Sequence, residues 1–580
     1  MKVSEYVIEF LSDAGIDTIF GQIGGFNADL LDAIDLNKKQ KFVLNYHEQG
    51  AAFAANAHAM VRGDVSVATS SGAPSSCNLI GGIANAYFDS IPCLFLVGSV
   101  HSKALRKSPD IRQNAFEEID MVSLVSEIIK YAVKVTNPLD IRFYLEKLLY
   151  IANEGRKGPV LIDIPYDVAR AEITVDDLKG FIPDELKTAA VTFNKFNEHE
   201  VVELLQAAKK PLILLGGGCR NHSSRILVEK FLEKVSIPAV ASLCGLDVLP
   251  AEHPSYFGFI GHYGNRYANF AIANCDCLIV LGSRLDERQI AGDKSRFAGG
   301  ADIIRVDIDQ VELGRIDIKN ENLKEIKIHS SVENFLEKLI VTDMPVLNYD
   351  RWLDVVSEWQ NQYPSHEPGL EEVNANNFLY NISDYLPENL VVTVDVGQNQ
   401  MFAAQSLRLK RGNVLLNTGG YGSMGFSLPA AIGAAYARPD AIVLSINGDG
   451  GLMMNIQELQ VVQRDNLPIK IIVLNNNCLG MIRRLQERIY DNRTTGSVQG
   501  YQTPDYSKIA PSYGLDYVKI SSVDDYKLVD DVINSPSAVL IEVELPQNII
   551  NNPEPGAAID LQTPLLSQCE NEKIKSSCNF

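Results

Sequence analysis

Residues 446–481 constrain the possible folds of this chain more than any other segment. An apolar run at 441–446, of the kind that forms a buried parallel strand, leads to a Gly-Asp-Gly turn at 448–450. An amphipathic stretch follows, and a second apolar run at 469–474 ends in three asparagines, 475–477. This order predicts a strand-loop-helix-strand unit of a parallel sheet, with polar side chains at the carboxyl ends of neighbouring strands.

The polar groups at these two strand ends suit a phosphorylated ligand held through a metal. Glycine lets the backbone approach a phosphate closely, and Asp449 and Asn476, 27 residues apart, carry the hard oxygen atoms that Mg²⁺ prefers. We therefore expect a metal diphosphate here, unless the glycines and asparagines only form turns of an ordinary βαβ unit. The residues expected to contact the phosphorylated ligand are Gly448, Asp449, Gly450, Gly451, Asn476 and Met481. Those expected to contact the metal are Asp449, Asn476 and Cys478.

A second candidate group lies near the N-terminus, at Glu48. Residues 41–60 predict a strand and then an alanine-rich helix, and Glu48 stands at their junction among apolar neighbours. A carboxyl group in such surroundings can share a proton with a weakly basic ring nitrogen. The alternative is an ordinary acid at a helix N-terminus, where the helix dipole favours negative charge.

Together these segments resemble the thiamine diphosphate (ThDP) enzymes. The diphosphate motif of that family opens with GDG and closes with a paired Asn, and this chain also has QEL after the GDG and NNxxxGM at the end. The resemblance implies that Glu48, in HEQGA, is catalytic: it hydrogen-bonds the aminopyrimidine ring and so promotes loss of the thiazolium C2 proton. It also implies a homodimer or homotetramer, in which Glu48 of one subunit serves the cofactor bound through Asp449 of another.

Two further segments complete the expected cofactor site. In residues 419–437, Gly422 and Met424 precede a helix of small residues. In the family a bulky apolar residue at the position of Met424 keeps the cofactor bent, and core filling is the alternative role. The family's acetolactate synthase branch has QHQ where this chain has QNQ after an upstream apolar run, so one diphosphate contact differs. The residues of that run expected to bind the diphosphate are Gly397, Gln398 and Asn399.

Composition excludes several classes of protein. At 580 residues the chain has room for about three or four domains, and its 46% hydrophobic content is that of a globular enzyme. The formal charge of −21 disfavours nucleic acid as a partner. No run reaches the roughly 18 apolar residues of a membrane span, and the start carries acids rather than a signal peptide. The nine cysteines show no zinc-site spacing. We expect a cytoplasmic protein with neither a membrane nor a nucleic-acid partner.

Alternating apolar and amphipathic segments predict an α/β fold of three doubly wound parallel-sheet domains. The first, at 1–168, is the expected pyrimidine-binding domain, and a polar stretch at 169–200 is the expected linker. The second, at 201–345, is a nucleotide-type domain, and the third, at 346–546, is expected to bind the diphosphate. Residues 547–580 form a tail that contains Asn and Pro.

The middle domain carries a weaker pattern, that of a bound dinucleotide. Three glycines at 216–218 follow an apolar run, where the backbone can approach a nucleotide. The segment GSRLDER at 282–288 supplies guanidinium groups that suit phosphates, although surface ion pairs are the alternative. This segment resembles the GARFDDR element that contacts FAD in acetolactate synthases, which implies bound FAD. The residues concerned are Gly216, Gly217, Gly218, Arg284, Asp286, Arg288 and Asp307.

The resemblance to the catalytic or large subunits of acetolactate synthases extends from residue 20 to residue 558. Shared segments include HEQGA, ANAYFDS and GPVLIDIP. The differences lie around the expected acceptor pocket: SGAPSSCN at 71–78 replaces TSGPGATN, NAFEE replaces DAFQE, and a leucine replaces a tryptophan. The residues expected in this substrate pocket are Gly24, Phe116, Glu117, Met481 and Leu485.

These patterns predict a ThDP- and Mg²⁺-dependent carboligase that decarboxylates pyruvate and transfers the two-carbon unit to a second carbonyl. The acceptor is pyruvate or another 2-keto acid, or alternatively a larger ketone such as a nucleotide-linked keto sugar. A pyruvate oxidase or decarboxylase is a further alternative. The non-enzyme alternative is an inactive regulatory relative, against which the presence of Glu48, Asp449 and Asn476 argues. A small regulatory subunit is a conceivable partner that no segment indicates.

Overall fold

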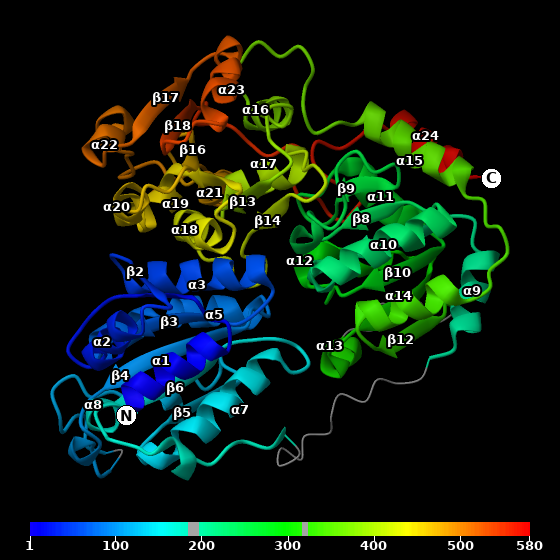
Figure 1. Ribbon diagram of the computed structural model, residues 1–580. Coiled ribbons are helices and arrows are strands. Elements are labelled where there is room, and N and C mark those ends of the chain that lie inside the picture. Colours follow the sequence, from blue (N-terminus) through cyan, green and yellow to red (C-terminus); the bar gives the residue numbers. More distant parts are fainter. Residues whose placement is uncertain (109, 184–195, 316–322, 580) are drawn as a thin grey trace.

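The computed structural model describes residues 1–108, 110–183, 196–315 and 323–579. They form three α/β domains, each with a six-stranded sheet whose neighbouring strands are all parallel (Figure 1). The prediction of three doubly wound parallel-sheet domains is confirmed. Residues 184–195, within the predicted linker, lie outside the described residues.

In every sheet the spatial order of the strands differs from their order along the chain. The first sheet contains, from edge to edge, β2 (Lys41–Leu44), β1 (Thr18–Gly21), β3 (Ser66–Ser70), β4 (Cys93–Ser99), β6 (Val160–Pro165) and β5 (Tyr131–Lys134). The second contains β12 (Glu325–His329), β11 (Asp302–Asp307), β10 (Cys277–Leu281), β7 (Pro211–Leu215), β8 (Ala239–Ala241) and β9 (Tyr256–Phe259). The third contains β14 (Val414–Leu416), β13 (Leu390–Val394), β15 (Ile442–Gly448), β16 (Ile469–Asn475), β18 (Val539–Glu544) and β17 (Asp516–Ile520).

Strand order points to where ligands bind. Numbered within each domain, the first and third sheets share the order 2-1-3-4-6-5, whereas the second has the order 3-2-1-4-5-6 of dinucleotide-binding folds, read from its opposite edge. In such open sheets ligands bind beyond the carboxyl ends of the strands, at the point where the order reverses. The three reversal points lie between β1 and β3, between β7 and β10, and between β13 and β15.

Helices cover both faces of the sheets (Figure 1). Those of the N-terminal domain are α1 (Val3–Asp13), α2 (Ala28–Asn37), α3 (Glu48–Arg62), α4 (Ala73–Asn78), α5 (Ile80–Phe88), α6 (Met121–Leu124), α7 (Ile141–Asn153) and α8 (Tyr166–Ala169). Those around the middle sheet are α9 (Glu198–Ala207), α10 (His222–Val235), α11 (Arg266–Asn274), α12 (Glu287–Ile290), α13 (Gln310–Arg315), α14 (Val332–Val341), α15 (Asp350–Gln362) and α24 (Gln568–Ser577). Those of the C-terminal domain are α16 (Ala375–Ile382), α17 (Gln398–Ser406), α18 (Ser427–Ala437), α19 (Asp449–Met454), α20 (Leu459–Arg464), α21 (Gly480–Ile489), α22 (Tyr506–Ser512) and α23 (Lys527–Ile533).

The N- and C-terminal domains join through α3 and α18, which lie against each other between the two sheets (Figure 1). Small residues allow the close approach: a Cβ atom built on Gly433 would lie 1.9 Å from the backbone oxygen of Ala54. Phe53 and Phe426 pack edge to face beside this contact, with ring centroids 5.5 Å apart. The alanine-rich pattern after Glu48 is therefore explained by a helix buried on all sides.

Two segments that were predicted to lie outside the middle domain pack against its core. Helix α15 lies in the range predicted for the C-terminal domain, but its Trp352 and Trp359 belong to the core of the middle domain. The tail, through Ile559 and Ile574, joins the same core, and α24 lies beside α15 (Figure 1). Among the described residues, no helix is both long and apolar enough to cross a bilayer.

Candidate functional site

The Gly-Asp-Gly turn lies where the sequence predicts it, at the end of a buried central strand. Strand β15 ends at Gly448 and α19 begins at Asp449, while the adjacent β16 ends at Asn475 in register with these residues. The Asp449 side chain is 3% exposed. Its Oδ1 atom accepts the N–H of Gly450 at 2.7 Å, and its buried Oδ2 atom has no hydrogen-bond partner of standard geometry among the described residues.

Residues from three strand ends meet beside this carboxylate. Asn476 donates its amide N–H to Gln398 Oε1 at 3.1 Å. A Cβ atom built on Gly480 would lie 1.8 Å from the same Gln398 oxygen, so a larger residue here would displace the Gln398 amide. Gly397 has φ = 133°, which glycine adopts without strain, and Asn399 Oδ1 lies 3.1 Å from a Cβ atom built on Gly448. The reversal point between β13 and β15 thus gathers the predicted diphosphate residues.

The oxygen donors fit a hard cation that is shared with a ligand. Burial raises the pKa of Asp449 to about 6, and a divalent cation would offset the cost of burying its charge. No group of three or more His, Cys, Asp or Glu within the described ranges surrounds a common point. Mg²⁺ usually binds through one or two carboxylates together with water and phosphate oxygens. The Cys478 thiol donates a hydrogen bond to the Gln547 carbonyl, and burial raises the pKa of this thiol to about 11. We therefore expect Cys478 to contact a metal through its backbone carbonyl oxygen and not through its sulfur atom.

Met424 lies directly over the turn. A Cβ atom built on Gly450 would be 3.4 Å from Met424 Cε. The loop that carries Met424 is held by Asp395, a residue that the sequence analysis did not single out, which accepts the N–H groups of Gly425 and Ser427, each at 3.0 Å. Its only sequence signal is its place at the end of the apolar run before Gly397. Gly422 has φ = 71° and donates its N–H to Thr418 in the same loop.

Glu48 is the first residue of α3 and is 8% exposed. Its carboxylate accepts hydrogen bonds from Ser75 Oγ at 2.7 Å and from Asn78 Nδ2 at 2.9 Å, both within the N-terminal domain. No hydrogen bond in the described part of this chain joins Glu48 to the residues around Asp449.

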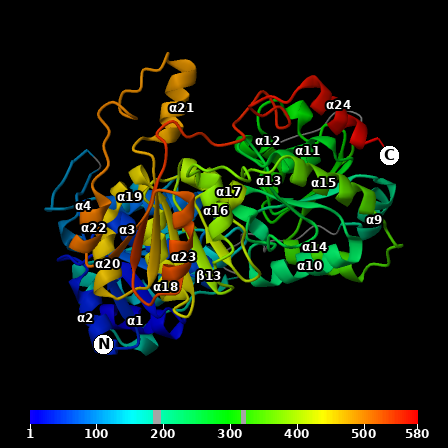
Figure 2. The ribbon, with the colours of Figure 1, turned by 90° about the horizontal axis from the view of Figure 1, so that it is seen from above.

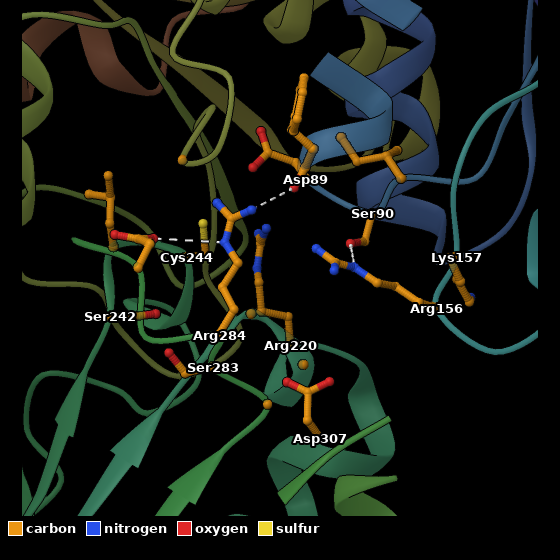
Figure 3. Close-up of a pocket in the computed structure, with 18 of the residues that line it drawn as sticks. Asp89, Ser90, Arg156, Lys157, Arg220, Ser242, Cys244, Ser283, Arg284 and Asp307 are labelled. Atoms are coloured by element: carbon orange, nitrogen blue, oxygen red, sulfur yellow. Dashed lines mark hydrogen bonds and ion pairs between the residues drawn. The ribbon is translucent and has the colours of Figure 1, made fainter. Parts of the chain in front are cut away.

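A cavity of about 560 Å³ lies at the reversal point between β7 and β10, and all three domains contribute to its wall (Figure 3). This volume is in the range of small-molecule sites. Figure 3 shows the guanidinium groups of Arg284, Arg220 and Arg156 directed into one space below Asp89. Arg284 donates to the Phe88 carbonyl at 3.4 Å, which joins the middle and N-terminal domains at the cavity wall.

The cavity contains most of the predicted dinucleotide residues and several that the sequence did not reveal. Gly217, Gly218, Arg284, Asp286, Arg288 and Asp307 line it. Gly216 does not; a Cβ atom on it would lie 2.1 Å from Gly282 O, so its role is close packing of two strand ends. The wall residues outside the predicted set come from all three domains. They are Asp89 and Ser90, which lie in the shared ANAYFDS segment, together with others that include Arg156, Lys157, Arg220, Cys244, Met401 and Asn417.

The predicted substrate-pocket residues form two groups. Near the end of β1, Gly24 packs on Ser71, and a Cβ atom built on Gly72 would lie 2.8 Å from Glu117 Oε2. Phe116 beside them is 81% exposed. The second group lies on α21, which stands away from the body of the molecule (Figure 2), and its Leu485 is 45% exposed. The contacts described within this chain do not join Met481 or Leu485 to the first group.

Comparison with known proteins gives one consistent result along the chain. Residues 1–124 match the N-terminal TPP-binding domain of thiamine pyrophosphate enzymes, residues 199–339 match the central domain, and residues 395–543 match the C-terminal TPP-binding domain. The chain is 32% identical to the acetolactate synthase large subunit of Lactococcus lactis, over 99% of this chain and 98% of that one. It is 33% identical to the acetolactate synthase isozyme 1 large subunit of Escherichia coli over 96% of each. It is 34% identical to a probable acetolactate synthase large subunit of Methanocaldococcus jannaschii, over 91% of this chain and 89% of that one.

Proposed function

Since the chain belongs to the thiamine pyrophosphate enzymes and aligns throughout with acetolactate synthase large subunits, we propose that it is a carboligase that takes pyruvate as donor. It would decarboxylate pyruvate and join the remaining two-carbon unit to a second carbonyl compound. The observation that carries this proposal is the buried Asp449 carboxylate with an unpartnered oxygen among the described residues, beside Asn476 and below Met424.

The chain's own residues have separate tasks in this reaction. Asp449 and Asn476 would hold Mg²⁺, which would anchor the diphosphate, while Met424 would press on the bound cofactor from above. When bound, ThDP supplies the electron sink for decarboxylation. Glu48 would exchange a proton with the aminopyrimidine ring, and its own donors, Ser75 and Asn78, would keep the carboxylate pointed at that ring.

We assign FAD to the middle-domain cavity. The strand order 3-2-1-4-5-6, the guanidinium groups of Arg284 and Arg288, and the acceptor Asp307 at the end of β11 suit a dinucleotide. The purified protein should then be yellow. Arg284→Ala should weaken FAD binding by about 1.5–3 kcal/mol, as loss of a hydrogen bond to a charged phosphate does. The measurement is a titration of flavin fluorescence, with the exposed Arg493→Ala as the control.

The acceptor pocket favours a second candidate, a carboligase that uses a ketone larger than pyruvate. Leu485 stands where the acetolactate synthase pattern has Trp. An aromatic side chain buries about 150–250 Å². A pocket without that wall is wider. Glu117 adds a carboxylate where a 2-keto acid would bring its own, and like charges placed together disfavour binding.

Identification of the products from labelled pyruvate by mass spectrometry tests the proposal. Pyruvate is supplied alone and together with a panel of ketones and keto sugars, and the Glu117→Gln and Leu485→Trp variants are run in parallel. Acetolactate as the dominant product in every case would identify pyruvate as the acceptor and remove the second candidate. Acetate or acetyl phosphate, with bleaching of the flavin, would instead indicate an oxidase and contradict carboligation.

A further inference from the structure

Glu458 is a buried carboxylate that belongs to the C-terminal domain but binds the N-terminal domain. It ends a 3₁₀ turn (Ile456–Glu458) that follows α19, and its side chain is 0% exposed. Its Oε1 atom accepts the backbone N–H groups of Tyr46 and His47 at 3.0 and 3.1 Å. Its Oε2 atom accepts the side-chain amide of Asn45 at 2.9 Å. Three donors from consecutive residues of one domain therefore converge on one carboxylate of another.

The three donors lie immediately before Glu48. His47 is the N-cap of α3 and Glu48 is its first residue, so a shift of residues 45–47 would move the Glu48 backbone directly. The first turn of α3 also rests on Glu458: a Cβ atom built on Gly50 would lie 2.7 Å from Glu458 Oε1. Arg464 adds a fourth link between the domains by donating to the Leu44 carbonyl at 2.8 Å.

We propose that Glu458 is a positioning residue for Glu48, and that it fixes the β2–α3 junction so that the Glu48 carboxylate meets the cofactor in one orientation. This inference rests on the proposed function, in which Glu48 exchanges a proton with the cofactor. Glu458 lies nine residues after Asp449, so one short segment connects the proposed metal site to the residues that precede Glu48. The hydrogen bonds of Glu458 with Asn45, Tyr46 and His47 are called the clamp below.

The clamp responds to pH. Burial raises the pKa of Glu458 from 4.5 to about 7, against the opposing effects of its three donors and of Arg464. On the C-terminal side the charged neighbours are Arg464 and Asp465, which form an ion pair with each other. On the N-terminal side the His47 imidazole accepts the Gln49 N–H through its Nδ1 atom. A protonated carboxyl group keeps Oε1 as an acceptor for the two backbone N–H groups but has lost its negative charge, so the three hydrogen bonds to Glu458 are strongest above about pH 7.

Asn45 can form a hydrogen bond with Glu458 in either the ionised or the protonated form of that carboxyl group. Its Oδ1 atom is buried without a hydrogen-bond partner among the described residues, while its amide nitrogen donates to Glu458. If the amide turns over, this oxygen can accept from a protonated Glu458 or from a glutamine at the same position. Glu458→Gln therefore keeps the shape of the clamp and removes only its charge, whereas Glu458→Ala removes the clamp.

Two measurements test the proposal. The first is hydrogen–deuterium exchange of the peptide that spans residues 41–52 in cofactor-free protein, which does not depend on what the enzyme catalyses. Glu458→Ala should speed exchange there, while Glu458→Gln and a control on α20, Gln460→Ala, should match the parent protein. The second is the rate of C2-proton exchange of bound ThDP, which should fall about 10- to 100-fold in Glu458→Ala, the loss typical of a misplaced catalytic group.

The pH profile separates positioning from a purely structural role. The parent protein's C2-exchange rate should rise from pH 6 to pH 8, and this rise should flatten in Glu458→Gln at unchanged KM for pyruvate. Parent-like exchange in both measurements for Glu458→Ala would overturn the proposal. If Glu458→Ala does not fold, a Glu458→Gln profile identical to that of the parent has the same meaning. If Glu458→Ala alters the peptide exchange but the parent protein shows no ThDP-dependent reaction, the proposed function is contradicted. The clamp then remains as a structural finding.

Discussion

At the scale of single residues, the orientation of Glu48 depends on two side-chain donors from α4. Ser75 and Asn78 bind its two carboxylate oxygens separately. Ser75 lies in SGAPSSCN (71–78), the segment where the sequence differs from the TSGPGATN pattern that it otherwise resembles. It also accepts the Ser71 N–H at 3.3 Å, which links Glu48 to the residue on which Gly24 packs.

Ser75→Ala should therefore slow proton exchange at the C2 atom of bound ThDP without weakening cofactor binding. One lost hydrogen bond to a charged group is worth about 1.5–3 kcal/mol, so a decrease of roughly 10-fold or more is expected. Exchange is followed by NMR after acid quenching, and ThDP affinity by calorimetry. Glu48→Gln serves as the reference that abolishes exchange at unchanged affinity. Pyruvate decarboxylation at the parent rate in Glu48→Gln would show that Glu48 is not the catalytic carboxylate.

At the scale of secondary-structure elements, the contact between α3 and α18 holds the two ThDP-binding domains together. The helices approach so closely at Gly433 that a single methyl group would overlap the backbone of Ala54. Backbone cannot yield as a flexible side chain does, so the helices would have to separate.

Gly433→Ala should destabilise the protein by about 1–3 kcal/mol, the usual cost of overpacking, despite the better helix propensity of alanine. The measurement is the midpoint of denaturant unfolding. Gly300→Ala is the matched control, because nothing lies within 4 Å of a Cβ atom built there. An unchanged midpoint in Gly433→Ala would mean that the helices can move apart at no cost.

The strand ends and their glycine turns show how much of this structure the sequence predicts. Apolar runs and Gly-Asp-Gly predicted the ends of β15 and β16 because buried parallel strands have an unmistakable composition. Three glycines in a row predicted ligand contact equally at Gly216, Gly217 and Gly218. Only the first turned out to lie outside the cavity wall and pack on Gly282, since a glycine needed for close backbone packing and one needed by a ligand look identical in sequence.

At the scale of the whole molecule, the residues that sequence could not predict are those brought together by domain packing. Asp89 of the N-terminal domain accepts the N–H of Gly420 from the C-terminal domain at 2.7 Å and lines the cavity of the middle domain. Arg156 reaches the same cavity, where it pairs with Asp309 and Glu312 of the middle domain. Asp89 lies in the shared ANAYFDS segment, but no local pattern indicates which residues it contacts, because its partners lie far away along the chain.

The proposed sharing of each cofactor between two subunits leads to a prediction about assembly. If Glu48 of each subunit serves the cofactor bound through Asp449 of the other, two inactive variants should complement each other in a mixed dimer. Glu48→Gln and Asp449→Ala homodimers each lack a complete site. A dimer with one subunit of each kind has one site with both residues intact and one site with neither.

Co-expression of the two variants should therefore restore activity. With random assortment about half of the dimers are mixed and each has one working site of two, so about a quarter of the parent activity is expected. Purification through two different affinity tags should raise this to about half, with one ThDP bound tightly per dimer. If instead both residues act within one subunit, every site in a mixed dimer contains one defect. Purified mixed dimers without activity would then show that each chain builds its own site, against the trans arrangement.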